Sequence, residues 1–283
     1  MYNNKSKSNE RSNRVILNSL PFKKIIVLLF FSMLMFPFIV LILWAFSKHW
    51  PAGAILPVEW GLRGWHYMLN PQNKMLGVIG VSFGLSLSVT LLAIIISIPA
   101  GKALGLHDFP LKNLVEILVL APIIIPPITV GMGIHIAFIK YGLADTFLGV
   151  MLIHLVVVLP YGIRIFASVY KAMGRKWDEQ SRALKAKGWQ RFLYVSLPML
   201  RPGLIASGIL MFNVSFSQYF LTFLIGGGKI VTLPLVLFPY VNSGDRVVGS
   251  VISLVFIMVA LVFMIVVEKA ITDGRQQPQY YYL

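Results

Sequence analysis

Six long apolar runs constrain the fold of this chain more than any other feature of its sequence. A helix rises about 1.5 Å per residue, so about 20 apolar residues cross the hydrocarbon core of a bilayer. Hydrophobic residues make up 57% of the 283 positions and charged residues only 12%, which is too little polar surface for a soluble domain of this length. We predict an all-α, polytopic membrane protein with about six transmembrane helices, at residues 25–46, 77–100, 113–139, 146–170, 203–225 and 249–267.

Prolines interrupt the third and fourth runs, at Pro122, Pro126, Pro127 and Pro160. Membrane helices tolerate proline where neighbouring groups satisfy the freed carbonyls, so these runs are predicted to be kinked helices.

The first run could be a signal peptide. It is too long for a typical signal core and no small-residue cleavage pattern closes it, so we predict an uncleaved helix.

The distribution of Lys and Arg predicts the orientation. On alternate loops, 18 of the 25 basic residues fall on one side and six on the other. By the positive-inside rule, both termini face the cytoplasm. The predicted organisation is therefore a cytoplasmic tail over residues 1–24, a permease domain over 25–269 with a cytoplasmic loop at 171–202, and a second tail over 270–283.

Charge and cysteine content exclude several function classes. The net charge of +15 comes from basic residues at the ends of apolar runs and not from a separate basic domain, so no nucleic-acid partner is predicted. The chain has no cysteine, which excludes disulfides, thiolate metal sites and thiol catalysis. The histidines lack metal-ligand spacing, so no metal site is predicted.

The loop between the fourth and fifth apolar runs carries the most information. Asp178 is a candidate N-cap that can also pair with Arg182, and Gly188 is a candidate helix stop. A second short helix is predicted to follow and to end near Pro198. Small side chains on the first helix would let a partner approach its backbone. Either a docking element or an ordinary charged loop accounts for this pattern.

This loop resembles the signature loop of binding-protein-dependent ABC importer permeases. The family pattern is Glu-Ala-Ala, three residues, Gly, nine residues, Ile-x-Leu-Pro. Glu179 matches its start, and Val195, Leu197 and Pro198 match its end. Gln180 and Ser181 replace the two alanines, and Lys185 stands where the family has glycine. We therefore expect the break between the two short helices to have moved to Gly188.

The resemblance covers residues 77–269, because segments 121–127, 154–161, 215–228 and 232–234 are also similar to family patterns. It implies a type I importer fold in the bacterial inner membrane. It also implies two ATPase subunits, a second permease that is identical or paralogous, and an external solute-binding protein. By this resemblance the ATPase-docking residues are Glu179, Arg182, Ala183, Leu184, Lys185, Ala186, Gly188, Val195, Leu197 and Pro198.

Enzymatic activity is not predicted for this chain. The string Gly226-Gly-Gly-Lys229 lacks the spacing of a phosphate-binding loop. No catalytic constellation is found either. The resemblance implies that ATP and Mg²⁺ are bound by the partner ATPase, so no cofactor is expected in this chain.

Polar residues inside the apolar runs are candidates for a substrate pathway, since polar groups in a bilayer are costly. Asn213 and Ser217 share a helical face, as do His154 and Tyr161. The candidate pathway residues are Asn213, Ser217, Gln218, His154 and Tyr161. The alternative is that these residues hydrogen-bond between helices.

Two questions stay open at this stage. A secondary transporter driven by an ion gradient is the rival function, although such proteins usually keep an ionisable residue near the membrane centre and show inverted repeats. The substrate is also open. The region 212–228 resembles permeases for polyamines, phosphonates and ferric iron, many of which carry acidic residues where Ser217 and Gln218 stand. Their absence weakens the case for a strongly cationic substrate.

Overall fold

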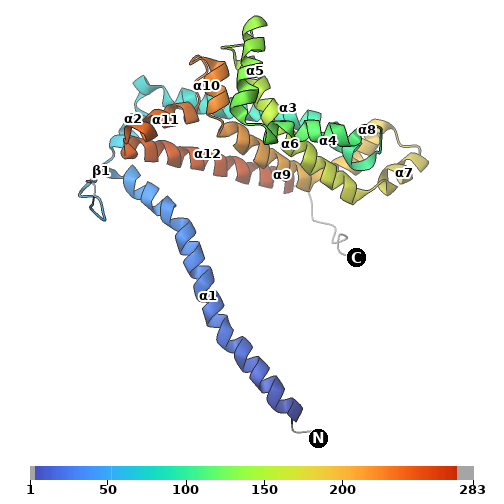
Figure 1. The fold of residues 1–283 in the computed structure, drawn as a ribbon, viewed down its shortest axis with the longest axis horizontal. Coiled ribbons are helices and arrows are strands. Elements are labelled where there is room, and N and C mark those ends of the chain that lie inside the picture. The colour runs from blue at the N-terminus through green and yellow to red at the C-terminus, as the bar shows by residue number, and fades with distance from the viewer. Residues whose placement is uncertain (1–3, 52, 273–283) are drawn as a thin grey trace. The chain divides into compact units, whose positions relative to one another are not determined.

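The computed structural model describes the backbone of residues 4–51 and 53–272, and side chains from Lys24 onwards within those ranges. The chain is built almost entirely from helices (Figure 1). The predicted tail 270–283 lies outside the described residues from position 273 on. The elements are α1 (Asn4–Ala45), β1 (Ser47–His49), β2 (Glu59–Trp60), α2 (Arg63–Leu69), η1 (Pro71–Asn73), α3 (Met75–Leu106), α4 (Lys112–Ile124), α5 (Pro127–Lys140), α6 (Phe147–Met173), α7 (Lys176–Ala183), α8 (Gly188–Arg191), η2 (Phe192–Ser196), α9 (Leu197–Phe216), α10 (Phe220–Gly226), α11 (Leu233–Ser243) and α12 (Arg246–Thr272).

The number of membrane helices agrees with the sequence prediction. Among the described residues, five helices are long and apolar enough to cross a membrane, or six if α4 and α5 form one broken span. Four predicted spans correspond to the apolar part of α1 and to α3, α6 and α12. Helix α1 begins at Asn4, so the helix extends back into the predicted tail 1–24.

The third predicted span is not a kinked helix. Helices α4 and α5 meet at an angle of 100°, which makes this segment a broken span or a re-entrant loop. Ile125 and Pro126 have extended backbone, with ψ of 132° and 131°. Each of these residues precedes a proline, and the ring of the next proline disfavours helical backbone at the residue before it. Two consecutive prolines therefore break the helix.

The fifth predicted span, 203–225, is also broken. Helix α9 ends at Phe216 and α10 begins at Phe220, so residues 217–219 are non-helical. A further short apolar helix, α11, follows and was not predicted. Non-helical backbone at membrane depth is stable only where protein groups or water satisfy it, which makes this break a candidate functional site.

The chain forms two compact units. The first comprises residues up to Tyr67 together with Arg246–Leu254. Strands β1 and β2 form its two-stranded antiparallel sheet. The indole of Trp44 stacks on Trp50 with ring centroids 4.5 Å apart, and the Arg246 guanidinium lies 5.4 Å from the Trp44 ring. The cation–π contact thus ties the end of α1 to the start of α12.

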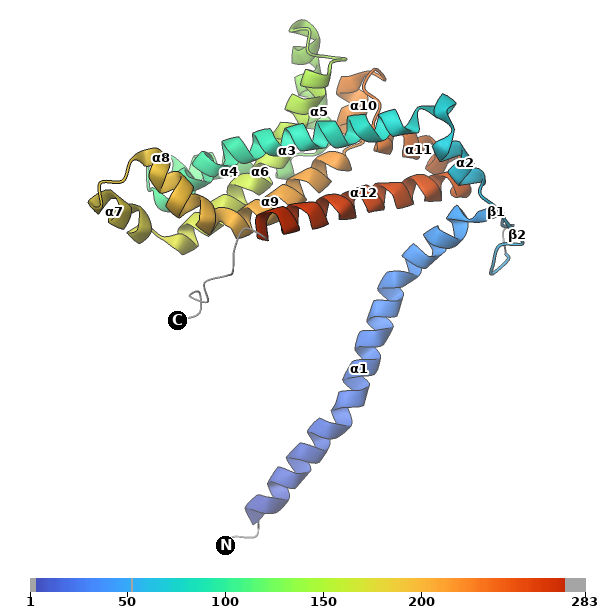
Figure 2. The ribbon, with the colours of Figure 1, turned by 180° about the vertical axis from the view of Figure 1, so that it is seen from behind.

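The second unit comprises Met68–Asp245 and the chain from Val255, and α3, α6 and α9 form its centre (Figure 2). Helices α3 and α6 approach closely at two glycines. A Cβ at Gly101 would lie 2.5 Å from Phe166 Cβ, and one at Gly105 would lie 2.6 Å from the Ala167 carbonyl oxygen. Small residues allow this contact between membrane helices.

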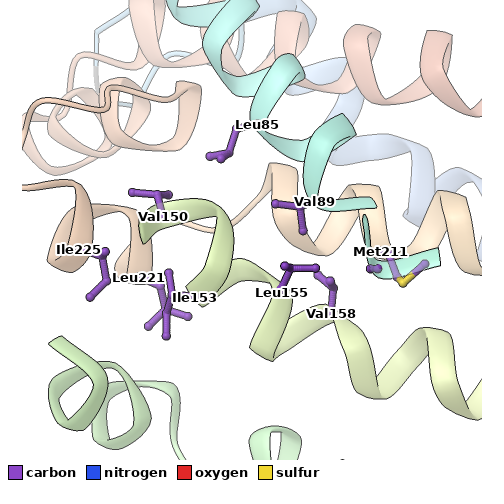
Figure 3. Packing of buried hydrophobic residues seen from close by; sticks show 10 residues of the cluster. Leu85, Val89, Val150, Ile153, Leu155, Val158, Met211, Leu221 and Ile225 are labelled. Atoms are coloured by element: carbon purple, nitrogen blue, oxygen red, sulfur yellow. The ribbon is translucent and has the colours of Figure 1, made fainter. Parts of the chain in front are cut away.

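An apolar core of the second unit lies where four helices meet (Figure 3). Leu85 and Val89 come from α3, and Met211 comes from α9. These side chains pack against residues of α6 and α10. The remaining members are Ala93, Val150, Ile153, Leu155, Val158, Leu221 and Ile225.

Candidate functional site

The predicted docking loop forms α7 and α8 at the end of the bundle opposite α11, as both ribbon views show (Figure 2). Asp178 lies in the first turn of α7 and is not its N-cap, because Arg175 occupies that position. The predicted pair with Arg182 is confirmed, with Asp178 Oδ2 3.0 Å from Arg182 Nη2. Asp178 Oδ1 also lies 3.2 Å from Arg191 Nη1 and 3.8 Å from Lys102 Nζ.

Asp178 is therefore the charged centre of the segment, and its side chain is only 18% exposed. It brings together α3, α7 and α8, which carry its three cationic partners. The sequence could suggest only the partner one helical turn away on the same helix. Lys102 and Arg191 are too far along the chain for a local pattern to reveal their contact.

The end of α7 corrects the prediction that the break had moved to Gly188. Lys185 has a left-handed backbone, with φ of +55°. Its N–H donates to the Arg182 carbonyl, and the Ala186 N–H donates to the Ser181 carbonyl. These two hydrogen bonds form a Schellman motif, in which glycine is the favoured residue at the left-handed position. The break lies where the family has glycine, and Lys185 adopts the conformation that glycine would.

Gly188 has a different role from the one predicted. It begins α8 and is not among the residues with positive φ. A Cβ at this position would meet only the Arg191 guanidinium, at 3.8 Å. The Gln190 side chain accepts a hydrogen bond from the Lys187 N–H and so caps the start of α8.

The second short helix does not end near Pro198. It passes through the π-helical turn η2 and continues into α9. The Leu197 N–H donates to the Phe192 carbonyl, five residues back. Pro198 directly follows this turn, inside the continuous helical segment Gly188–Phe216. The wider turn fits proline without a break.

The predicted docking residues are mostly accessible. Among the ten, Glu179, Arg182, Ala183, Leu184, Lys185, Gly188 and Pro198 are exposed, whereas Ala186, Val195 and Leu197 are partly buried. The Leu184 side chain is 83% exposed. Trp177 and Trp189 are also exposed and were missed, although large indoles inside a charged loop were a visible signal. Exposed large apolar groups beside charged ones are typical of a protein interface.

His154, a predicted pathway residue, lies inside the packed bundle with 1% exposure. Its Nδ1 is 2.9 Å from Ser215 Oγ and its Nε2 is 2.9 Å from Thr222 Oγ1. The single hydroxyl hydrogen of Thr222 goes to the Gln218 carbonyl, at 2.8 Å. Thr222 must then accept from Nε2–H, and Nδ1 accepts from the Ser215 hydroxyl.

The four groups form one directed chain of hydrogen bonds from α9 through α6 to α10, and the chain ends on a carbonyl of the broken segment 217–219. Both ring nitrogens of His154 are occupied by the bundle itself. This geometry favours the alternative reading, in which a polar residue joins helices to one another.

Three of the other four predicted pathway residues lie near the break between α9 and α10. Ser217 is exposed, and its hydroxyl donates to the Asn213 carbonyl at 2.8 Å. The Asn213 amide nitrogen donates to the Ile209 carbonyl at 3.0 Å. Gln218 is partly buried, and Tyr161 packs against the apolar core. The structure thus brings Asn213, Ser217 and Gln218 together at the break and leaves Tyr161 with the core. Among the described residues, no three of His, Asp or Glu are grouped to hold a metal ion.

Comparison with known proteins gives one family and several relatives. Residues 93–273 match the family described as binding-protein-dependent transport system inner membrane component. The chain is 35% identical over 124 residues to the molybdate/tungstate transport system permease protein of Thermococcus kodakarensis, a match that covers 44% of this chain and about half (49%) of that protein. It is 24% identical over 233 residues to the putrescine transport system permease protein of Escherichia coli K12, covering 79% and 81% of the two chains.

A third relative is the putative 2-aminoethylphosphonate transport system permease protein of Salmonella typhimurium. It is 22% identical over 243 residues, which cover 85% of this chain and 90% of that protein. Among solved structures, a bacterial ABC transporter involved in the import of the acidic polysaccharide alginate shares the fold. Its TM-score is 0.61 at 15% sequence identity, with 98% of this chain and 99% of that chain covered.

Proposed function

Given that this chain belongs to the family of binding-protein-dependent transport system inner membrane components, and so is a permease subunit of an ABC importer, we propose that α7 and α8 form its docking site for the ATPase subunit. The observation that carries this proposal is the exposed surface of the segment. Leu184, Trp177 and Trp189 lie open beside the charged residues Glu179 and Arg182.

Burial of these groups against a partner would provide the binding free energy. Removing one large apolar side chain from water contributes roughly 1.5–3 kcal/mol. Ala183 is exposed and lies next to Leu184, so a partner surface can approach the end of α7 closely. A charge placed at Ala183 would be buried without a partner in the complex, which costs several kcal/mol, roughly 3–5 when one member of a buried ion pair is removed.

The test is co-purification of the ATPase subunit with substituted permease, followed by measurement of binding-protein-stimulated ATP hydrolysis in nanodiscs. Ala183→Asp and Glu179→Lys should weaken docking or uncouple hydrolysis from uptake while the permease stays in the membrane. Ala172→Asp, at an exposed alanine near the end of α6, is the matched control. Full coupling in both docking variants would remove this segment from the interface.

We further infer that the break between α9 and α10 contributes to the translocation path. Asn213, Ser217 and Gln218 are grouped there, and none carries a charge. A neutral path suits a small polar solute and leaves selection of that solute to the external binding protein.

The partners follow from the same proposal. A binding protein outside and two ATPase subunits inside would work with this chain and with a second permease, either identical or paralogous. ATP and Mg²⁺ would be bound by the ATPase subunits. Uptake that stops with an ATPase inhibitor and survives an uncoupler would distinguish this importer from a transporter driven by an ion gradient.

A further inference from the structure

The base of the docking segment is attached to α3, a helix to which it is not joined in sequence. The Arg175 guanidinium, immediately before α7, donates to the carbonyl of Leu106, the last residue of α3, with Nε at 2.7 Å and Nη2 also in contact. One turn back on α3, Lys102 forms the ion pair with Asp178 described above. Two successive turns of α3 are therefore held by Arg175 and Asp178, at the start of the docking segment.

These contacts suit a mechanical connection. The last four carbonyls of a helix lack partners within the helix, and a cation is favourable at that end of the dipole. Two nitrogens of the Arg175 guanidinium, Nε and Nη2, donate to one such carbonyl. A hydrogen bond from a charged donor is stronger than one between neutral groups. Leu106 itself is buried in a cluster with Phe166, Tyr170 and Leu200, so the attachment point cannot move independently of the bundle.

The opposite end of α3 is attached to another part of the unit. The hydroxyl of Ser82 accepts a hydrogen bond from the N–H of Leu233, the first residue of α11, at 2.8 Å. At 1.5 Å per residue, the α3 segment between Ser82 and Lys102 spans about 30 Å. Helix α3 thus connects the docking segment at one end of the unit with α11 at the other, as the ribbon shows (Figure 2).

From this geometry we propose that Arg175 and Asp178 are positioning residues that make α3 move with the docking segment, so that a displacement produced by the ATPase reaches α11. The proposal rests on the docking function proposed above. Asp178 is mostly buried, and the guanidinium of the exposed Arg175 bonds the Leu106 carbonyl. Neither residue is among those proposed to contact the ATPase subunit. Removing the connection should leave docking intact and impair the transmission of movement.

The experiment uses the complete complex of permease, ATPase and binding protein in nanodiscs. Because the chain has no cysteine, spin labels can be placed at Lys176→Cys on α7 and Asp108→Cys just after α3, both exposed. With native Arg175 and Asp178, the label distance should be the same without nucleotide and with a non-hydrolysable ATP analogue. In Arg175→Met/Asp178→Asn the distance should differ between these states.

Transport provides the second measurement. In the double variant, solute taken up per ATP hydrolysed should fall about tenfold, within the range usual for coupling between two sites. The amount of co-purified ATPase should be unchanged. Arg175→Lys keeps the positive charge but loses the two-nitrogen contact of the guanidinium. This variant should therefore retain more coupling than the double variant and less than the native protein. Lys171→Met, at an exposed lysine of α6, should behave as wild type.

Three results would overturn the proposal: a label distance that changes with native Arg175 and Asp178, an unchanged uptake per ATP in the double variant, or loss of the co-purified ATPase. The last would mean that these residues only fold the docking segment. Failure of the docking proposal itself would look different, because Ala183→Asp and Glu179→Lys would then retain the ATPase subunit and full coupling.

Discussion

The backbone N–H of Lys185 donates to the carbonyl of Arg182 at 2.8 Å, and this contact closes the docking helix with a lysine in the left-handed region. A non-glycine residue with this backbone costs about 1 kcal/mol or more. The position tolerates lysine because the Schellman hydrogen bonds stabilise the turn. Helix α7 thus ends where the family pattern has glycine, with a lysine in the left-handed conformation that glycine adopts most readily.

Substitution at Lys185 should therefore affect the turn more than substitution at Gly188. Lys185→Gly should stabilise the turn by about 1 kcal/mol, since glycine adopts this backbone without steric cost. Lys185→Val should destabilise it. Gly188→Leu should have little effect, because the site is open. Hydrogen exchange at the Ala186 amide measures the local opening free energy, and a larger effect at 188 than at 185 would contradict the assignment.

Loss of the His154 side chain should lower stability. His154→Leu would leave the Ser215 hydroxyl and the Thr222 oxygen without their partner inside the bundle, and an unsatisfied buried polar group costs about 1–3 kcal/mol. The expected result is a lower Tm in detergent. His135→Leu, at a partly buried histidine of α5, is the control and should change Tm less. Equal Tm values for the two variants would argue against the hydrogen-bonded chain.

Ser217→Trp should block uptake without affecting assembly. Ser217 is exposed at the break between α9 and α10, so an indole there has room to occupy the path without displacing the core. The measurement is solute uptake together with the Tm and subunit content of the purified complex. Ser243→Trp, at an exposed position on α11, should transport normally. Normal uptake by Ser217→Trp would show that Ser217 does not line the translocation path.

Single-cysteine labelling should settle the orientation predicted from basic residues. Lys187 and Asn242 are both exposed, and the native chain has no background thiol. In intact cells, a membrane-impermeant maleimide should label Asn242→Cys and not Lys187→Cys. Permeabilised cells serve as the control, in which both should react. Labelling of position 187 from outside would falsify the topology.

The Lys48–Glu59 ion pair should give the β1–β2 hairpin a pH dependence. Lys48 Nζ lies 3.0 Å from Glu59 Oε2, and this hydrogen bond and charge lower the pKa of Glu59. A lowered folded-state pKa means that the stabilisation is present above the ordinary glutamate pKa and is lost as pH falls through the lowered value. Carbon-13 titration of Glu59 should show this shift, and Lys48→Met should raise the pKa back. An unchanged pKa in that variant would contradict the assignment.

The sequence by itself determined the class of the protein and most of its helices. Apolar runs of membrane length and loops with unequal basic content are local properties, and the spans matching α3, α6 and α12 follow from them. The segment from Glu179 to Pro198, for which we propose the docking role, was also singled out by the spacing of its residues along the chain. Each of these features depends on residues close together in sequence.

Tertiary structure decided what a local pattern cannot specify. The consecutive prolines 126 and 127 marked a disturbance, but only the packed structure turned it into a 100° bend. Lys185 takes a left-handed backbone because the Schellman contacts favour it, against its own preference. His154 became a link between helices, and Asp178 gained Lys102 and Arg191, through contacts between residues distant in the chain. Their free energies arise only when the helices pack.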